Sequence, residues 1–215
     1  MTPEARREAN EQLLQKHGIP INPHLPMIED ADAVILRTEE ELWGRLVALW
    51  GVVGRAMLRE NAWFKEYFSP LARRTLLTAD EATFLFDDAP KEEDLVRFSW
   101  RLEAMMFLAW CAGLVDDPGM PSAPSSAEAI LPLYPHDLGD ATMLREAIRM
   151  RPKEEILDWA DRLYRLHWAV RDAHLNRREP PPGLNPGVVL EWHHAVNWMT
   201  RYGEEDDWDA VGTDT

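Results

Sequence analysis

The apolar residues of this chain recur with the period of an α-helix over several long stretches. Behind a capping box formed by Thr38 and Glu41, they return every three or four residues, which predicts a helix over about residues 38–60. Pro90 opens a second pattern over residues 91–114, and the second half of this pattern is apolar on every side. We therefore expect the segment 91–114 to be the buried central helix of the fold.

Further helix signals divide the rest of the chain. Caps and prolines followed by helical periodicity predict long helices from Pro3 to a stop at Gly18, over about 152–177, and over 186–202. Shorter helices are expected within 61–88, near 126–133 and over 140–150, where Asp140 is the expected cap. Because no alternation typical of a strand persists for more than a few residues, the sequence predicts an all-α fold.

Proline-rich segments separate these helices. Residues 18–37 are expected to be an extended loop and residues 178–187 a rigid proline-rich turn, and the acidic tail 204–215 follows the last helix. Residues 115–126 combine Pro, Gly and Ser, so a subdomain break could fall there, although we favour a loop within one domain. The expectation is a single irregular multi-helix domain spanning residues 1–215.

The charge of the chain limits its partners. Lys and Arg number 23 against 38 Asp and Glu, which gives a net charge of −15. Such a field repels a phosphate backbone, so we expect no nucleic-acid partner. A basic partner is compatible with this charge, and so is an acidic surface that only keeps the protein soluble.

Cysteine usage and hydropathy indicate a cytoplasmic protein. The lone Cys111 excludes an internal disulfide and lies in an apolar run, as a small buried residue in a reducing compartment does. The polar amino terminus has no apolar stretch of the secretory kind. The longest uncharged apolar run, residues 104–115, is much shorter than the roughly 20 residues that span a bilayer, so no membrane association is expected.

Glu103 is the most unusual residue of the predicted central helix. It lies among apolar side chains, and no basic residue stands three or four positions away. A buried carboxylate needs a partner, and Arg171, His167 and His174 are our candidates. The group is then either a structural ion pair or a functional carboxylate with a raised pKa.

The helix over 152–177 carries the other candidate groups. His167 and His174 fall on its apolar face, about two turns apart, as core histidines or as a general acid or base. That distance is too long for the usual helical metal pair. Asp161 and Arg165 fall on the opposite face, where we expect a solvated ion pair.

A weak metal signal lies in the last helix. Glu191 and His194 have the i,i+3 spacing of ligands in ferritin-like bundles, but a second such pair is missing. His193 and His194 point away from the apolar stripe of this helix and are expected at the surface or its rim. The chain also lacks the common phosphate-loop, zinc-protease, Cys-x-x-Cys and Gly-x-Ser-x-Gly motifs, so no cofactor is expected.

Several stretches resemble a bacterial family of unknown function, numbered four-two-seven-two. They are HGIPINPHLP at 17–26, FSWRLEA at 98–104, RPKEEILDWADRLYRLHWAVRDAHLN at 151–176, PPPGLNPGVVLEWHHAVNW at 180–198, and the terminal WDAVGTDT. The resemblance implies one helical domain and brings no activity or catalytic residue with it. Because the family pattern runs to the end of the chain, it also implies that Trp208 docks on the fold and holds the acidic tail.

Two functional hypotheses remain open. The first is an acidic helical interaction or regulatory protein without catalytic activity, which binds a protein partner or assembles with itself. The second is an enzyme of unfamiliar type, with a polar or metal site formed by Glu103, His167, Arg171 and His174. It requires these four side chains to converge on a cavity that solvent can reach.

Overall fold

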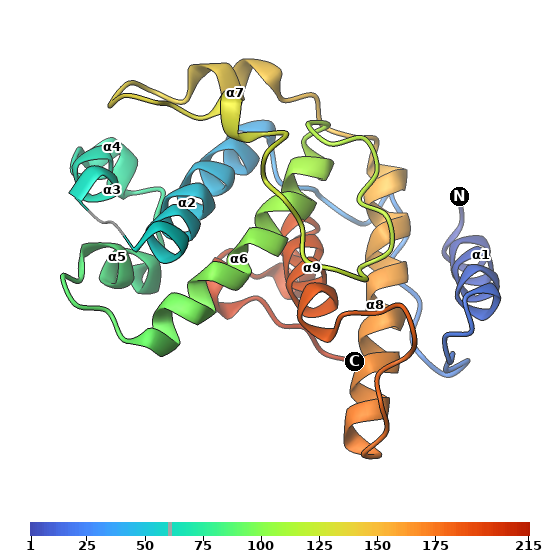
Figure 1. Cartoon of the computed structure of the whole chain (residues 1–215). Helices are drawn as coiled ribbons and strands as arrows, with labels where there is room; N and C mark the ends of the chain where they lie inside the picture. The colour runs from blue at the N-terminus through green and yellow to red at the C-terminus, as the bar shows by residue number, and fades with distance from the viewer. Residues whose placement is uncertain (60–61) are drawn as a thin grey trace.

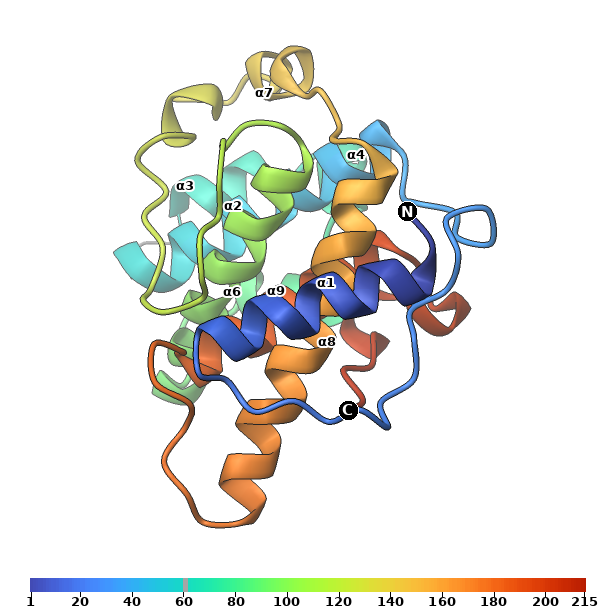
Figure 2. The same ribbon diagram turned by 90° about the vertical axis from the view of Figure 1, so that its right-hand side faces the viewer.

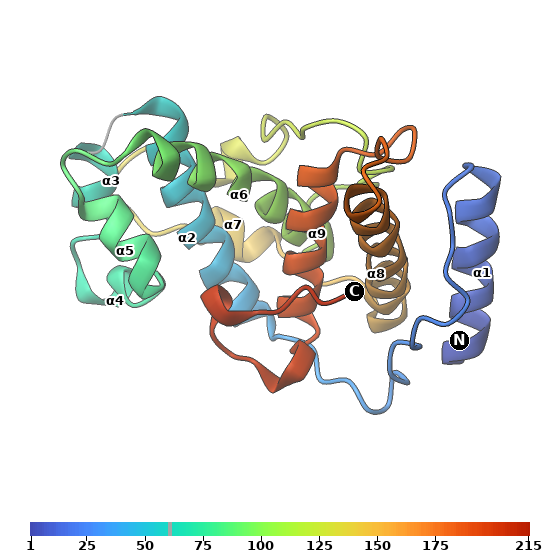
Figure 3. The ribbon, with the colours of Figure 1, turned by 90° about the horizontal axis from the view of Figure 1, so that it is seen from below.

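Five long helices lie side by side in one row, as Figures 1 and 3 show. The computed structural model describes residues 1–59 and 62–215. In spatial order the row is α2 (Glu39–Leu58), α6 (Glu92–Cys111), α9 (Pro186–Met199), α8 (Lys153–Leu175) and α1 (Pro3–Lys16). The described residues contain no strand, which confirms the all-α prediction.

Short helices and 3-10 turns pack around this row, mainly against α2 and α9. They are α3 (Ala62–Tyr67), α4 (Leu71–Arg74), α5 (Ala79–Phe86), α7 (Thr142–Ala147) and the 3-10 turns η1 (Leu131–Leu133), η2 (Tyr202–Glu204) and η3 (Trp208–Ala210). The helix expected near 126–133 is only the turn η1. Ala141, not Asp140, precedes α7, and it provides no side-chain cap. Residues 60 and 61, where one predicted helix ends and another segment begins, lie outside the described chain.

The local signals of α2 act as expected. Thr38 Oγ1 accepts a hydrogen bond from the Glu41 amide at 3.2 Å, and Glu41 Oε2 accepts one from the Thr38 amide at 2.8 Å. Farther along, a Cβ atom at Gly54 would lie 2.2 Å from the ring of Phe64. The absent side chain thus lets α3 pack closely on α2.

The predicted central helix is confirmed in α6, whose second half is buried from Glu103 to Cys111. Phe107 on this helix contacts Trp159 of α8 and Trp192 of α9, with ring centroids 5.9 and 5.5 Å apart. These large side chains join three helices of the row into one core. No helix in the described ranges has the length and apolar character needed to cross a membrane.

The loop over residues 115–126 packs against the central helices. Ser125 hydrogen-bonds to Glu103 of α6, and the amide of Asn185, at the start of α9, donates to the Pro121 carbonyl at 2.7 Å. One hydrophobic cluster contains residues from both sides of this loop. The structure is therefore a single domain built around one core.

The acidic tail docks on the fold, as the family resemblance implied. Trp208 is buried between α9 and α2, with its ring 4.4 Å from the ring of His194 and 4.8 Å from the guanidinium carbon of Arg45. Arg37 also holds the tail, because it donates to the Glu205 carbonyl and to Asp206, each at 2.7 Å. The tail thereby forms one wall of the groove described below.

Candidate functional site

Glu103 is buried, but its partner is a serine. Its carboxylate oxygens accept hydrogen bonds from the backbone amide of Ser125 at 2.8 Å and from the hydroxyl of Ser125 at 2.7 Å. Among the residues that the structure describes, none of the expected partners His167, Arg171 and His174 hydrogen-bonds or ion-pairs with Glu103. Charge-assisted hydrogen bonds from one loop residue satisfy this carboxylate instead of a cation.

The four residues of the enzyme hypothesis do not come together. His167 is buried, whereas Arg171 and His174 are exposed. Figures 1 and 2 show the reason, because the last turns of α8 extend beyond the neighbouring helices into solvent. An apolar stripe on a helical wheel is buried only as far as another element covers it.

The pair Asp161–Arg165, expected in solvent, is buried, and that expectation was wrong. Each side chain is 1% exposed, and Arg165 donates twice to Asp161, at 2.9 and 2.8 Å. Asn10 and Glu11 of α1 bind the same group, at 3.0 Å to Asp161 and 3.0 Å to Arg165. Helix α1 crosses this face of α8 and covers it, as Figure 2 shows.

His193 and His194 were expected at the surface, and both are buried. Helix α9 has α6 and α8 on two sides and the docked tail on a third, so little of its surface reaches solvent. Glu191 pairs with Arg101 at 3.0 Å and has no hydrogen bond or ion pair with His194. Burial raises the pKa of Glu191 and lowers the pKa of His194 to about 3. In the described chain, no three His, Cys, Asp or Glu side chains are grouped as a metal would require.

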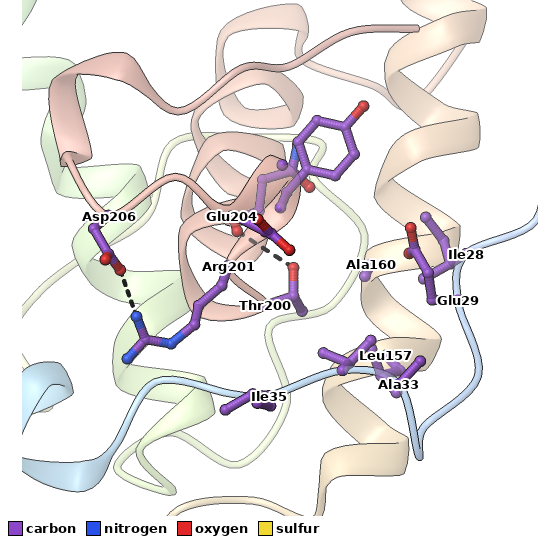
Figure 4. Close-up of a pocket in the computed structure, with 14 residues that line it drawn as sticks. Ile28, Glu29, Ala33, Ile35, Leu157, Ala160, Thr200, Arg201, Glu204 and Asp206 are labelled. Atoms are coloured by element: carbon purple, nitrogen blue, oxygen red, sulfur yellow. Dashed lines mark hydrogen bonds and ion pairs between the residues drawn. The ribbon is translucent and has the colours of Figure 1, made fainter.

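A groove of about 470 Å³ lies between the loop before α2, helix α8 and the C-terminal tail. Figure 4 shows its walls: Ile28, Glu29 and Ile35 come from the loop, and Glu204 and Asp206 come from the tail. The buried side chains of Leu157 and Ala160 on α8 form an apolar floor. We call this space the acidic groove. Its volume is typical of ligand sites.

A smaller recess of about 160 Å³ continues the acidic groove. The two spaces share Ile28, Glu29, Asn197 and Tyr202. The other residues around the recess are Pro26, Met27, Tyr164, His193 and Asp214. We call it the histidine recess. It brings together residues from the first loop, α8, α9 and the end of the chain.

His193 lies in this recess and is paired with His167 behind it. Their Nδ1 atoms are 2.9 Å apart, so one ring donates a hydrogen bond and the other accepts it. Burial lowers the pKa of His167 to about 4, with Arg171 adding to the effect. Burial lowers the pKa of His193 to about 3, with His167 and His194 adding to it. Both imidazoles are therefore neutral at pH 7.

The acidic groove carries more negative than positive charge. Its only cation among the described lining residues, Arg201, already donates to Asp206 at 2.5 Å and to Glu41 at 2.6 Å. Figure 4 shows the first of these contacts. The carboxylates of Glu29 and Glu204 have no hydrogen bond or ion pair within the described ranges. The groove therefore presents acceptors that a cationic ligand could use.

The sequence pattern did not indicate Tyr164, Asn197, Tyr202 and Asp214 as site residues. One signal was present, because His193 and Asn197 are spaced i,i+4 and so lie on one face of α9. Tyr164 lies on α8, whereas Tyr202 and Asp214 come from the C-terminal segment, whose path depends on how the tail docks.

A family model described as "Domain of unknown function (DUF4272)" matches residues 6–211 of the chain. No curated protein and no solved structure matches the chain.

Proposed function

The chain belongs to the DUF4272 family, whose description names no activity. From the geometry of the acidic groove, we propose that the protein is a non-catalytic interaction protein that binds a basic segment of a partner protein. The observation that carries the proposal is the set of carboxylates, on Glu29, Glu204 and Asp214, that surround the connected spaces without a partner in the described chain. Basic side chains supply the complementary charge.

The floor of the groove favours basic side chains over small inorganic cations. Leu157 and Ala160 present apolar surface beneath the carboxylate rim. Lysine and arginine side chains have an apolar stem that packs on such a surface and a charged end that reaches the rim. A segment that alternates basic and apolar residues would therefore match both parts of the groove.

The loop wall is fixed before any ligand binds. Lys153 Nζ donates to the carbonyls of Ala31 at 2.8 Å and Val34 at 2.9 Å, and Arg6 donates to the Glu29 carbonyl at 3.2 Å. A wall that is already ordered loses little conformational entropy on binding. This supports a binding role for the groove.

The tail wall contains two residues in a rarely adopted backbone conformation. Arg201 has φ 54° and Glu204 has φ 58°, both in the left-handed region, and Gly203 lies between them. Non-glycine residues in this region cost free energy, and they concentrate at ligand clamps and active sites. The turn holds Glu204 against the mouth of the groove.

The proposal extends to location and partner class. The net charge of −15 disfavours nucleic acid as the partner. We also propose a cytoplasmic location, because Cys111 is single and fully buried, as thiols of reducing compartments commonly are.

Fluorescence anisotropy with a labelled peptide of alternating lysine and leucine tests this function. We expect saturable binding to the full-length protein that weakens with added salt, and no binding of the matched glutamate–leucine peptide. Glu29→Gln combined with Glu204→Gln should weaken binding of the lysine peptide about tenfold.

The matched control removes two exposed carboxylates away from the groove, by Glu128→Gln with Glu179→Gln. The control has the same net charge as the groove variant. If the two double variants lose affinity equally, the peptide responds only to overall charge and the acidic groove is not its site.

A further inference from the structure

We propose that the histidine recess is an alkylammonium subsite that takes the side chain of a lysine in the bound segment. This inference rests on the proposed function and deepens it. It assigns the site to Tyr164, His193, Asn197, Tyr202 and Asp214, which line the recess together with Glu29.

Two buried side chains that line the recess each carry an acceptor atom without a hydrogen-bond partner in the described chain. Asn197 is 5% exposed, and its Nδ2 donates to the Gly212 carbonyl at 2.8 Å, while its Oδ1 accepts no hydrogen bond from the described residues. His193 is 2% exposed, and its Nδ1 is used by His167. The Nε2 of His193 has no partner in the same part of the chain either, and neither acceptor atom is fully enclosed. A ligand that enters the recess can therefore reach both acceptors.

Carboxylates and aromatic rings complete the surroundings of a cation. Glu29 and Asp214 line the recess, and both side chains are exposed. Tyr164 and Tyr202 line it as well, and the ring of Tyr164 lies 6.1 Å from that of His193. Tyrosine faces attract ammonium groups through the ring quadrupole, which is the basis of aromatic cages for amines.

The histidine pair can adapt to an ammonium ligand. When His193 donates from Nδ1 to His167, its Nε2 carries a lone pair that accepts a hydrogen bond. In the reverse tautomer, Nε2 carries a hydrogen and would oppose a cation. An ammonium group therefore selects the first arrangement, and no charge moves to either ring.

The recess fits lysine better than arginine. An ammonium group has three donors on one atom, and Asn197, His193 and Asp214, each of which carries an acceptor, all line the recess. A guanidinium group is a planar fork suited to a pair of oxygens on one carboxylate. The volume of about 160 Å³ also holds a short alkyl chain, since one water in the liquid takes about 30 Å³.

Titration of the labelled full-length protein with n-butylammonium chloride, followed by NMR, tests the recess directly. We expect saturable shifts of the Tyr164 and Tyr202 ring signals, and a His193 Nε2 resonance at the position of an unprotonated nitrogen. The neutral isostere n-butanol should cause neither change. Equal shifts with n-butanol, or none with n-butylammonium, would overturn the site.

Variants at exposed positions avoid the risk of unfolding. Asp214→Asn and Tyr202→Leu should each weaken n-butylammonium binding at least fivefold, whereas Glu179→Gln should leave it unchanged. If the two recess variants behave like Glu179→Gln, the amine binds elsewhere and the proposal fails.

Peptides separate this proposal from the proposed function. Replacing the lysines of the lysine–leucine peptide by arginine should weaken its binding about fivefold, and replacing them by norleucine should abolish it. Peptide binding without n-butylammonium binding would leave the groove function standing and refute the recess. The opposite result would refute the groove function and retain an amine site. Tighter binding of free putrescine than of the peptide would refute a lysine as the source of the ammonium group.

Discussion

The Nδ1 atoms of His167 on α8 and His193 on α9 lie 2.9 Å apart in the interior, directly behind the histidine recess. A hydrogen bond between two imidazoles needs at least one neutral ring, because a doubly protonated pair has no acceptor. The two helices are therefore joined by a contact that depends on the protonation of both rings.

This contact makes the stability of the fold depend on pH. The pKa values of His167 and His193 are about 4 and 3 in the folded protein, and that of the nearby His194 is also about 3. In the unfolded chain each is near 6.5. The unfolded chain therefore binds more protons as the pH falls from about 6.5 towards 4, so the folded state loses stability in this window and keeps it in full above pH 7.

Urea unfolding at pH 7 and pH 5 measures this loss. With an unfolded pKa near 6.5, each of the three histidines accounts for a loss of about 2 kcal/mol in the free energy of unfolding at pH 5. Coupling between the paired rings makes the total loss smaller than the sum of the three. The positive groups that face them are Arg171 beside His167, and Arg45 and Arg101 beside His194. His193→Gln should reduce the difference in unfolding free energy between pH 7 and pH 5, whereas replacement of the exposed His24 should leave this difference unchanged. Equal stability at the two pH values would contradict neutral buried histidines.

Glu103→Gln should destabilise the fold by about 1–3 kcal/mol. Both carboxylate oxygens of Glu103 accept a hydrogen bond from Ser125, and the glutamine side chain has an NH2 donor in place of one of these oxygens. Ser125→Ala should lose less, since the backbone amide remains. Chemical unfolding gives both values, with Glu128→Gln as a surface control expected within about 0.5 kcal/mol of the unaltered protein. A stabilised Glu103→Gln variant would show instead that the carboxylate is strained.

Asp161→Asn should cost about 3–5 kcal/mol, because it leaves the buried charge of Arg165 with Glu11 as its remaining partner. Asp158, which pairs with Arg162 at 2.7 Å on a more exposed part of α8, supplies the comparison. Asp158→Asn should cost less than about 1 kcal/mol. Similar losses for the two variants would mean that α1 does not shield the Asp161 pair from solvent.

Trp208→Ala should lower the melting temperature by roughly 10 °C, from a loss of about 3–5 kcal/mol at a buried tryptophan. Removal of residues 204–215 should lower it at least as far, since Arg37 then loses its contacts with Glu205 and Asp206 as well. Differential scanning calorimetry distinguishes the docked tail from a loose one. An unchanged melt after truncation would show that the tail contributes nothing to the fold.

The helices were largely predictable because their signals are local. The capping box of Thr38 and Glu41 and the asparagine cap at Asn185 each act within four residues, and the structure contains both. Burial of the central helix was predictable too, because its second half is apolar on every side. Glu103 was correctly expected in the interior, although its serine partner lies in a loop whose path no local signal describes.

The candidate site was not predictable in the same way. A helical wheel gives the face on which Asp161 and His193 lie, but it does not tell whether α1 or the tail covers that face. The acidic groove also joins Glu29 to Glu204 across most of the chain. Such a contact depends on how the loop before α2, helices α8 and α9, and the tail pack together.

The most direct test of the lysine subsite is a double-mutant cycle between Asp214→Asn in the protein and the replacement of one lysine at a time by norleucine in the lysine–leucine peptide. Isothermal titration calorimetry gives the four binding free energies, and their difference isolates the interaction between the two groups. We expect a favourable coupling of about 1 kcal/mol between Asp214 and one lysine of the peptide. A coupling of zero at every lysine position would contradict an ammonium group in the histidine recess.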